Sequence, residues 1–472
     1  MTDDANAPFR RHPTGIPGLD DVLGGGLFVG AVYLIAGRPG SAKTTLSNQV
    51  AFDHVRRGGR ALYVSLLAES HARMLAMLES MSFFRAEVVG DSLRYLSGYQ
   101  ALEKEKLGGL MRMLRASVRD HRATMLVIDG LLTASDLAEN DVDLKKFIHE
   151  VQVLSELSGC TTLLLRGGHD THENYPERTM ADGLLLLTAR RVGMRSVREI
   201  EVQKHRGSAH VLGSSFFEIS GSGLTVFPRT EARIGLDLVG RDDGAAARVP
   251  TGVDGLAVLL EGGIAARSTT MLLGSPGVGK TLLGLHFLEA GARNHEPCLY
   301  FGFCESPTRI FRKAGDVGID LASHAQAGML EVQWHSPQEP VADQLAELLF
   351  ENVRRRNVRR VFIDAFEGFR SGLIYPERAQ AFGISVAREL RSLGATTMFS
   401  EEFTGRSGPE PVLPEGTSEM VDNVLFLRHV ERRAQLHRLI SVVKISDHDY
   451  QTAMREFVIT PRGVQIVGDG SG

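Results

Sequence analysis

Cysteine and long apolar runs are scarce in this chain. Its 472 residues include three cysteines, Cys160, Cys298 and Cys304, which are too few and too scattered for a disulfide framework or a zinc site. The histidines show no spacing typical of metal ligands. No stretch approaches the length of a membrane span, and the opening MTDDANAPFRRHPTG lacks the apolar core of a signal peptide. These absences predict a cytoplasmic protein without a membrane partner.

An excess of charge of one sign is also missing. Lysine and arginine total 53 against 57 acidic residues, which gives a formal net charge of −4. The lone tryptophan, Trp334, offers no base-stacking platform. Both features argue against nucleic acid as a partner. Apolar residues make up 43% of the chain, enough for two domains that each bury their own core.

What the chain does have is an internal repeat. TGIPGLDDVLGGGL at 14–27 returns as TGVDGLAVLLEGGI at 251–264, and GRPGSAKT at 37–44 returns as GSPGVGKT at 274–281, both at an offset of 237 positions. Four further landmarks recur in the same order at offsets between 235 and 240. Such constancy indicates a tandem duplication. We predict a first domain over 1–232, a linker over 233–248 and a second domain over 249–472.

Each half alternates predicted strands and helices. Apolar runs predict strands at 31–36, 61–65, 125–128 and 161–165, and at 269–273, 298–301, 360–363 and 396–399. This alternation predicts an α/β fold with a mostly parallel sheet covered by helices on both faces. Later segments at 198–204, 216–219, 439–444 and 456–459 are spaced like an antiparallel extension of each sheet.

A phosphate-binding loop follows the first strand of each half. GSPGVGKT satisfies G-x-x-x-x-G-K-[ST], with a predicted strand before it and a helix after it. Backbone N–H groups of such a loop receive phosphates, Lys280 reaches the terminal phosphates, and Thr281 ligates magnesium. A plain glycine turn is the alternative interpretation, which this context disfavours. The sequence therefore predicts ATP and Mg²⁺ as cofactors.

The first loop departs from the pattern only at Ala42. A methyl group is harmless there if the backbone has negative φ, and costs about 1 kcal/mol or more if the backbone is left-handed. Because Gly37, Gly40, Lys43 and Thr44 remain, we expect the first loop to bind nucleotide as well.

An aspartate ends a buried strand in each half, Asp129 in the first and Asp364 in the second. A carboxylate at that edge of the sheet is placed to hold magnesium-bound water. An unpaired carboxylate on a buried strand would be costly, which favours this role.

Together these motifs resemble the KaiC family of duplicated RecA-type ATPases from clock and signalling systems. The resemblance rests on PTGIPGLDDVLGGGL, the loops, the ES after the second strand, the strand ending in aspartate and a K-x-R-G hairpin, and it covers nearly the whole chain. It implies homohexameric two-tier rings with ATP between subunits, slow hydrolysis, a signalling partner protein and, in some members, phosphorylation of a serine–threonine pair in the second domain.

The family usually has two adjacent glutamates after the second strand, and each half of this chain keeps only the second of them. Ala68 and Cys304 hold the first place, while Glu69 and Glu305 hold the second. The resemblance implies that Glu69 and Glu305 activate water. A helix-start acid favoured by the helix dipole is an equally good interpretation.

The hairpin differs more between the halves. In the first half, the resemblance implies that Lys204 and Arg206 reach a neighbouring subunit's phosphates, and Ser208 and His210 also match. In the second half Lys444 remains, but Ser446 and Asp447 replace arginine and glycine. Loss of an arginine finger predicts weak turnover there. A solvated hairpin edge is the alternative for Lys204 and Arg206.

The phosphorylated pair of the family maps onto Ser418 and Glu419. The glutamate carries part of a phosphate's charge permanently, so we expect this site to be locked in a phosphorylated-like state. Ser418 is therefore a candidate phosphorylation site, Thr417 is a poorer one, and a polar loop is the alternative.

These inferences define a predicted site and three candidate functions. The candidates are a magnesium-dependent ATPase ring that acts as a signalling switch with possible autokinase activity, a DNA-dependent motor or recombinase of the same fold, and a nucleotide-gated scaffold with little turnover. The predicted nucleotide-binding residues are Gly37, Gly40, Ser41, Ala42, Lys43, Thr44, Thr45, Ser208 and His210, then Gly274, Ser275, Gly277, Val278, Gly279, Lys280, Thr281, Leu282 and Lys444, with Thr44, Asp129, Thr281 and Asp364 at magnesium and Glu69, Glu305, Lys204 and Arg206 in catalysis.

Overall fold

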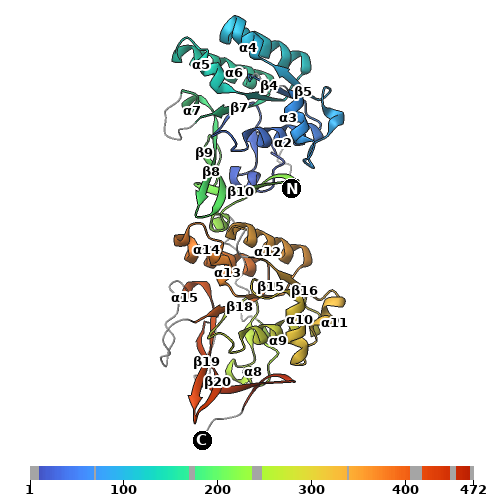
Figure 1. Ribbon diagram of the computed structural model, residues 1–472, viewed down its shortest axis with the longest axis vertical. Helices are drawn as coiled ribbons and strands as arrows, with labels where there is room; N and C mark the ends of the chain where they lie inside the picture. The colour runs from blue at the N-terminus through green and yellow to red at the C-terminus, as the bar shows by residue number, and fades with distance from the viewer. Residues whose placement is uncertain are drawn as a thin grey trace. The chain divides into compact units, whose positions relative to one another are not determined.

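The computed structural model describes residues 10–67, 71–168, 176–235, 247–336, 340–403, 417–446 and 453–467 (Figure 1). The chain divides into two compact units between Arg229 and Thr230. Each unit contains one large sheet and one two-stranded sheet, so the repeat in the sequence is also a repeat in the fold. The small sheets pair β1 (Arg11–His12) with β2 (Leu27–Phe28) and β12 (Arg248–Val249) with β13 (Ile264–Ala265).

The large sheet of the first unit has nine strands within the described residues, in the order β11-β10-β9-β8-β3-β7-β6-β4-β5. The six strands from β8 to β5 run parallel, and β9, β10 and β11 extend the sheet antiparallel. Their bounds are β3 (Val32–Gly37), β4 (Ala61–Ser65), β5 (Leu93–Ser97), β6 (Met125–Asp129), β7 (Thr161–Gly167), β8 (Gly183–Val192), β9 (Arg195–His205), β10 (Ser214–Ser220) and β11 (Gly223–Phe227).

The large sheet of the second unit repeats this topology. Its order over the described residues is β16-β15-β17-β18-β14-β19-β20-β21-β22, parallel from β16 to β19 and antiparallel beyond. The predicted α/β fold and the antiparallel extensions are therefore confirmed. The bounds are β14 (Thr269–Gly274), β15 (Cys298–Gly302), β16 (Leu330–Trp334), β17 (Arg360–Asp364), β18 (Thr396–Glu402), β19 (Asn423–Arg432), β20 (Gln435–Ile445), β21 (Arg455–Thr460) and β22 (Gly463–Ile466).

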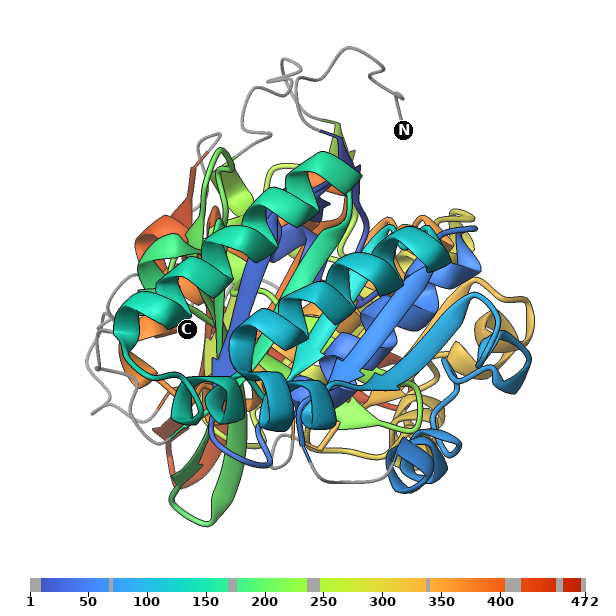
Figure 2. The ribbon, with the colours of Figure 1, turned by 90° about the horizontal axis from the view of Figure 1, so that it is seen from above.

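Helices cover both faces of the first large sheet. Successive residues of β3 point to opposite faces, so Val32 joins the core beneath α4 and α6 while Tyr33 joins the core beneath α2. Figure 2 shows α4 (cyan) and α6 (teal) side by side across one face. The helices are α1 (Leu19–Leu23), α2 (Lys43–Arg56), α3 (His71–Leu78), η1 (Ala86–Val88), α4 (Tyr99–His121), α5 (Leu131–Asp136), α6 (Asp141–Ser158) and α7 (Pro176–Met180).

The second large sheet is covered in the same way. Leu285 of α9 belongs to one core, and Leu345 of α12 and Phe382 of α14 belong to the other. Two separate apolar layers therefore sandwich each sheet. The helices are η2 (Thr230–Gly235), α8 (Leu256–Leu259), α9 (Lys280–Arg293), α10 (Pro307–Asp316), α11 (Leu321–Gln326), α12 (Ala342–Arg356), α13 (Glu367–Ser371), η3 (Pro376–Arg378), α14 (Ala379–Ser392) and α15 (Thr417–Met420).

A β-bulge interrupts the long hairpin of each unit at the same place. The register shifts between Leu184 and Leu185 in β8, which pair with Lys204 and Val202, so Gln203 is the extra residue of β9. The hairpin of β19 and β20 shifts in the same way one residue before Lys444. A bulge turns the side chain that follows it away from the regular alternation, so both bulges set the direction of a lysine.

The 3-10 helix η2 begins the second unit and is held there by charged groups. The backbone N and Oγ1 of Thr230 both donate to Asp343 Oδ1 at 2.9 Å. Arg378 forms ion pairs with Glu231 at 2.6 Å and with Asp343 at 2.8 Å. Because Asp343 is 2% exposed, these donors satisfy a buried carboxylate.

No helix in the described ranges combines the length and the apolar composition that a bilayer span requires.

Candidate functional site

The first loop connects β3 to α2, as the motif requires. Its first glycine, Gly37, has no room for a side chain, because a Cβ atom there would lie 2.4 Å from the carbonyl oxygen of Leu187. Lys43 Nζ donates to the carbonyl oxygens of Gly37 at 2.7 Å and Arg38 at 2.9 Å. The lysine thus folds back over the loop at the first turn of α2.

Ala42 has left-handed backbone conformation, with φ 76° and ψ 18°, directly before α2. Of the two possibilities that the sequence leaves open, the structure contains the costly one, about 1 kcal/mol or more for a residue with a Cβ atom. The counterpart Gly279 has φ 119° without that penalty. The Ala42 methyl packs against the core beneath α2, which offsets part of the strain.

The second loop connects β14 to α9 with the same contacts. Lys280 Nζ donates to the carbonyl oxygens of Gly274 at 2.8 Å and Ser275 at 3.1 Å. A Cβ atom on Gly274 would lie 2.4 Å from the carbonyl oxygen of Leu427. Burial lowers the pKa of Lys280, as it does that of Lys43. Both lysines therefore hold backbone oxygens in a partly dry site, where an incoming phosphate would be the stronger acceptor.

The other predicted loop residues lie in the same two segments. Val278 is fully buried in the core, so any contact that it makes with a nucleotide is through its backbone. Ser41 is buried beside Lys43, with Oγ 3.5 Å from Nζ. The remaining residues follow the chain through the loop into the helix: Gly40 and Thr45 in the first half, and Gly277 and Leu282 in the second.

The predicted magnesium residues meet in both halves. Thr44 Oγ1 lies 3.3 Å from Asp129 Oδ2, and Thr281 Oγ1 lies 3.1 Å from Asp364 Oδ2. A threonine hydroxyl and a carboxylate at the carboxyl end of a parallel strand are the oxygen donors that Mg²⁺ takes beside a phosphate chain. The residues present fit the ion.

A tyrosine that sequence reasoning missed holds each aspartate. Tyr63 OH donates to Asp129 Oδ2 at 2.6 Å, and Tyr300 OH donates to Asp364 Oδ2 at 2.8 Å. Burial, with the neighbouring aspartate as a further cause, raises the pKa of both phenols, so they stay protonated and keep donating. The two tyrosines occupy matching places on β4 and β15, a recurrence that could have revealed them.

The second site opens into a cavity of about 550 Å³. Its walls carry more charge than the motif predicts, because Glu367 of α13 and Glu402 of β18 lie there beside Lys280. Ser400, also missed, donates to Asp364 Oδ1 at 2.7 Å. The cavity is lined by Gly277, Gly279, Lys280, Thr281, Leu282, Cys304, Glu305, Arg309, Arg312, Lys313, Asp316, Val317, Asp364, Ala365, Glu367, Ser400, Glu402 and Ile459.

The candidate water-activating glutamates have different outcomes. Glu69 lies outside the described residues. Glu305 lines the cavity but forms ion pairs with Lys313 and, at 3.4 Å, with Arg309 of α10. Its Oε1 is thus held by Lys313, while its Oε2 has no hydrogen-bond partner in the described part of the chain.

The predicted hairpin residues contact other parts of their own unit. Lys204 Nζ donates to the carbonyl oxygen of Thr179 at 2.8 Å, and Arg206 lies 3.7 Å from Asp182. Ser208 Oγ donates to the carbonyl oxygen of Leu23 at 2.8 Å. His210 Nδ1 lies 3.4 Å from the carbonyl oxygen of Ser208, and Lys444 Nζ donates to the carbonyl oxygen of Val421 at 2.7 Å.

The candidate phosphorylation segment forms the short helix α15. The side chain of Ser418 lies outside the described residues. Glu419 is exposed, and its Oε2 accepts from Gln380 Nε2 at 3.4 Å. Thr417 is 3% exposed. Because it is buried, Thr417 is a poor acceptor of a phosphate.

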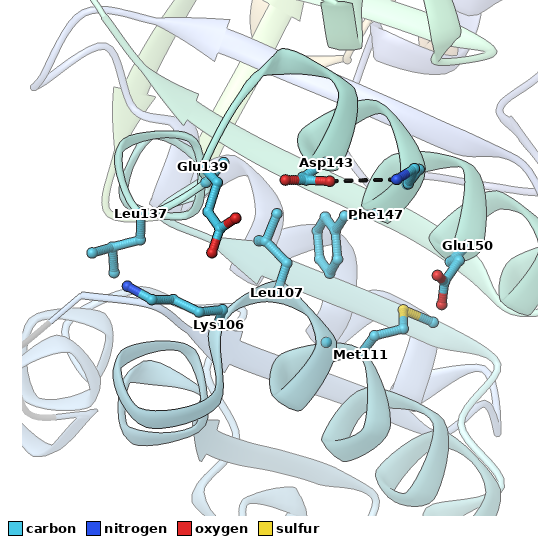
Figure 3. Close-up of a pocket in the computed structure, with 11 residues that line it drawn as sticks. Lys106, Leu107, Met111, Leu137, Glu139, Asp143, Phe147 and Glu150 are labelled. Carbon is cyan, nitrogen blue, oxygen red and sulfur yellow. Dashed lines mark ion pairs between the residues drawn. The ribbon is translucent and has the colours of Figure 1, made fainter.

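A further cavity of about 290 Å³ lies in the first unit between α4 and α6, away from the phosphate loop (Figure 3). Leu107 and Phe147 form its apolar centre, with Lys106 and Glu139 beside them. Lys106 has φ 58° and interrupts the helical geometry of α4. Asp143, one of three acids in its wall, is paired with Lys146 at 3.5 Å.

A phosphate loop between a parallel strand and a helix, with a strand-end aspartate beside it, defines a P-loop nucleotide-binding protein, and this chain has two such sites. The sequence model of the KaiC-type ATPases matches residues 12–231 and again residues 249–471, so the chain belongs to the KaiC ATPase family.

Curated relatives match nearly the whole chain. The circadian clock oscillator protein KaiC of Parasynechococcus marenigrum (strain WH8102) is 26% identical over 471 residues, which cover 97% of this chain and 90% of that protein. The protein of the same name from Thermostichus vulcanus is 24% identical over 476 residues, 98% of this chain and 90% of the relative. That of Prochlorococcus marinus (strain MIT 9313) is 24% identical over 470 residues, 97% and 92%.

Proposed function

We propose that the chain is a magnesium-dependent ATPase with one ATP site in each unit. The observation that carries this proposal is the repeated set of lysine, threonine, strand-end aspartate and tyrosine, which is complete in both halves. Catalysis of phosphoryl transfer is mainly positioning and charge stabilisation, and these residues supply both.

Each residue has a separate task in this proposal. Lys43 and Lys280 exchange backbone oxygens for the terminal phosphates, and the backbone N–H groups of the loops bind the phosphate chain. Thr44 and Asp129, like Thr281 and Asp364, would hold the magnesium ion. Bound magnesium would neutralise charge that develops on the phosphate oxygens. The tyrosines keep the aspartates aligned.

The proposal includes a homohexamer that acts as a switch in a cytoplasmic signalling system with a partner protein. Lys204 and Arg206 come directly after the bulge of the β8–β9 hairpin. In this proposal they leave Thr179 and Asp182 of their own unit to contact the phosphates of a neighbouring copy. The relatives named above are circadian clock oscillator proteins, which supports a signalling role of that type. Autophosphorylation at Ser418 is part of the same proposal. Intact-mass analysis after incubation with ATP tests it, since an added phosphate should disappear in Ser418→Ala.

A nucleotide-gated scaffold with little turnover is the second candidate. The ion pairs of Glu305 favour it, because a carboxylate held by Lys313 and Arg309 is less available as a base. Nucleotide-dependent assembly with phosphate release near the uncatalysed rate would support the scaffold over the ATPase.

Two lysine variants test the proposal. Lys43→Ala should remove most hydrolysis, on the order of 10²-fold or more, and weaken ring formation. Lys280→Ala should mainly abolish nucleotide binding in the second unit and any phosphate transfer. Phosphate release and oligomer mass are measured with and without Mg·ATP. Equal loss of hydrolysis in both variants would contradict the assignment of most hydrolysis to the first site. A monomer with empty sites at saturating Mg·ATP would refute the whole proposal.

A further inference from the structure

Glu367 is a carboxylate of the second cavity that no sequence motif identifies. It is the first residue of α13, three positions after Asp364, and it lines the same cavity as Lys280 and Thr281. Its Oε1 accepts from the backbone N–H of Glu402, while its Oε2 is buried without a hydrogen-bond partner in the described part of the chain. One oxygen is thus positioned and the other is unused.

The charges around the cavity place Glu367 at its phosphate end. Burial lowers the pKa of Lys280, and the negative charges of Glu402, Glu367 and Asp364 counteract this by raising it. Burial raises the pKa of the Cys304 thiol, and Asp364 and Glu367 are further causes. Glu367 therefore lines the same cavity as the loop lysine and Cys304, the position at which the KaiC resemblance implies a glutamate.

The competing carboxylate, Glu305, is engaged elsewhere. Lys313 and Arg309 pair with it along α10. Arg309 is exposed, and Glu305 Oε2 forms no hydrogen bond in the described part of the chain, so the main restraint on Glu305 is the ion pair of its Oε1 with Lys313. Glu367 meets no such obstacle, since its positioning contact is a backbone N–H group.

We propose that Glu367 is the general base of the second ATP site, a role that rests on the proposed ATPase function. Water oxygen bonds to the γ-phosphorus while the bond from that phosphorus to the bridging oxygen breaks. ADP leaves with the electron pair, and Glu367 accepts a proton of the water, which yields inorganic phosphate. The first unit has Leu132 at this place, so its base must differ.

The test uses the full chain in a Lys43→Ala background, so that phosphate release reports the second site. Glu367→Gln keeps an oxygen for the Glu402 N–H group but removes the base. General base catalysis contributes about 10²–10⁴-fold, so single-turnover hydrolysis should fall by about 10² or more. Mg·ATP affinity and melting temperature should not change. Glu305→Gln tests the competitor, and the exposed Glu377→Gln is the matched control.

Each outcome decides the question. A selective loss of rate in Glu367→Gln with unchanged affinity supports the proposal, since a purely structural role would alter melting temperature or affinity. Retained hydrolysis in Glu367→Gln overturns it and leaves the ATPase function intact. If the Lys43→Ala protein itself binds Mg·ATP but releases no phosphate, hydrolysis by the second site is refuted together with the role of Glu367.

Discussion

The two nucleotide sites have the same backbone path, but the alanine with left-handed backbone conformation lies at a different position in each. The first loop has Ala42 in left-handed conformation where the second has Gly279, and after the strand-end aspartate the second site has Ala365 with φ 67° where the first has Gly130. Each half therefore carries one alanine at a position that favours glycine. The surrounding fold determines these backbone angles strongly enough to tolerate a penalty of about 1 kcal/mol at each place.

The same comparison shows a larger difference in charge. Glu402 pairs in register with Gly274, and its counterpart in the first unit is Gly167, which pairs with Gly37. Glu367 corresponds to Leu132. The second site thus has acids at two positions where the first has Leu132 and Gly167, while the first has Arg206 where the second has Ser446. Duplication preserved the loops, and the chemistry beside them diverged.

The largest expected effect tests whether the first site depends on its arginine. In a Lys280→Ala background, Arg206→Ala should lower hydrolysis by about 10³, because a trans-acting arginine stabilises transition-state charge. Phosphate release measures it, and the exposed Arg191→Ala in the same hairpin is the control. Unchanged turnover would show that Arg206 is only a solvent-exposed charge at the hairpin edge.

Removal of the tyrosine hydroxyls should destabilise the two units by different amounts. Tyr63→Phe should lower the free energy of unfolding of the first unit by about 1.5–3 kcal/mol, because a buried carboxylate loses a donor. Tyr300→Phe should cost less, since Ser400 also donates to Asp364, whereas Leu165 occupies that place in the first unit. Urea unfolding followed by circular dichroism measures both. A larger cost for Tyr300→Phe would reverse the comparison.

Acid should weaken the first unit through two buried histidines. Burial, followed by nearby His12 and Arg11, lowers the pKa of His54 and His205 to about 4. Between pH 6.5 and 4 the unfolded chain binds these protons and the folded chain does not, so stability present above pH 6.5 is lost as pH falls. The slope is at most about 1.4 kcal/mol per pH unit for each histidine.

Trp334 makes this measurable, because the single tryptophan lies in β16 of the second unit. Burial also lowers the pKa of His286 and His335 in the second unit, but by less than it lowers those of His54 and His205. On moving from pH 7.5 to 5.5, the circular dichroism transition, which includes the first unit, should therefore shift to lower urea by more than the fluorescence transition. His149→Gln, at an exposed histidine, should leave the difference unchanged. Equal shifts of both signals would contradict the prediction.

The smallest expected effect concerns the strained alanines. Ala42→Gly and Ala365→Gly should each change the stability of their unit by about 1 kcal/mol in the stabilising direction, since glycine adopts positive φ without strain. Ala116→Gly in α4 is the control of opposite sign, because glycine weakens a helix interior. Thermal unfolding measures all three. Destabilisation by Ala42→Gly would mean that the packed methyl outweighs the strain.

The fold could be predicted from the sequence because most strands of the sheets are continuous apolar runs. The runs that end at Asp129 and Asp364 correspond to β6 and β17, fully buried strands. Edge strands β5 and β16 were not identified, since only their first residues are buried and no apolar run marks them. The loops and the pairing of threonine with aspartate followed from motif spacing.

The rest of the site depends on contacts between distant segments. Tyr63 lies 66 positions from Asp129, so no local pattern connects the phenol to the carboxylate. Glu367 looks like an ordinary helix-start acid until the cavity shows its neighbours. The φ of Ala42 is set by the loop around it and by the core beneath α2, neither of which a residue's identity reveals.

The helix η2 determines where a recombinant fragment of the second unit should begin. A recombinant fragment that starts at residue 249 would lack Thr230 and Glu231, and Asp343 would lose both donors from Thr230. Arg378 would then face Asp343 without its second acid. A fragment that starts just before Thr230 keeps this buried network closed, and the segment is in that sense the first structural element of the C-terminal module.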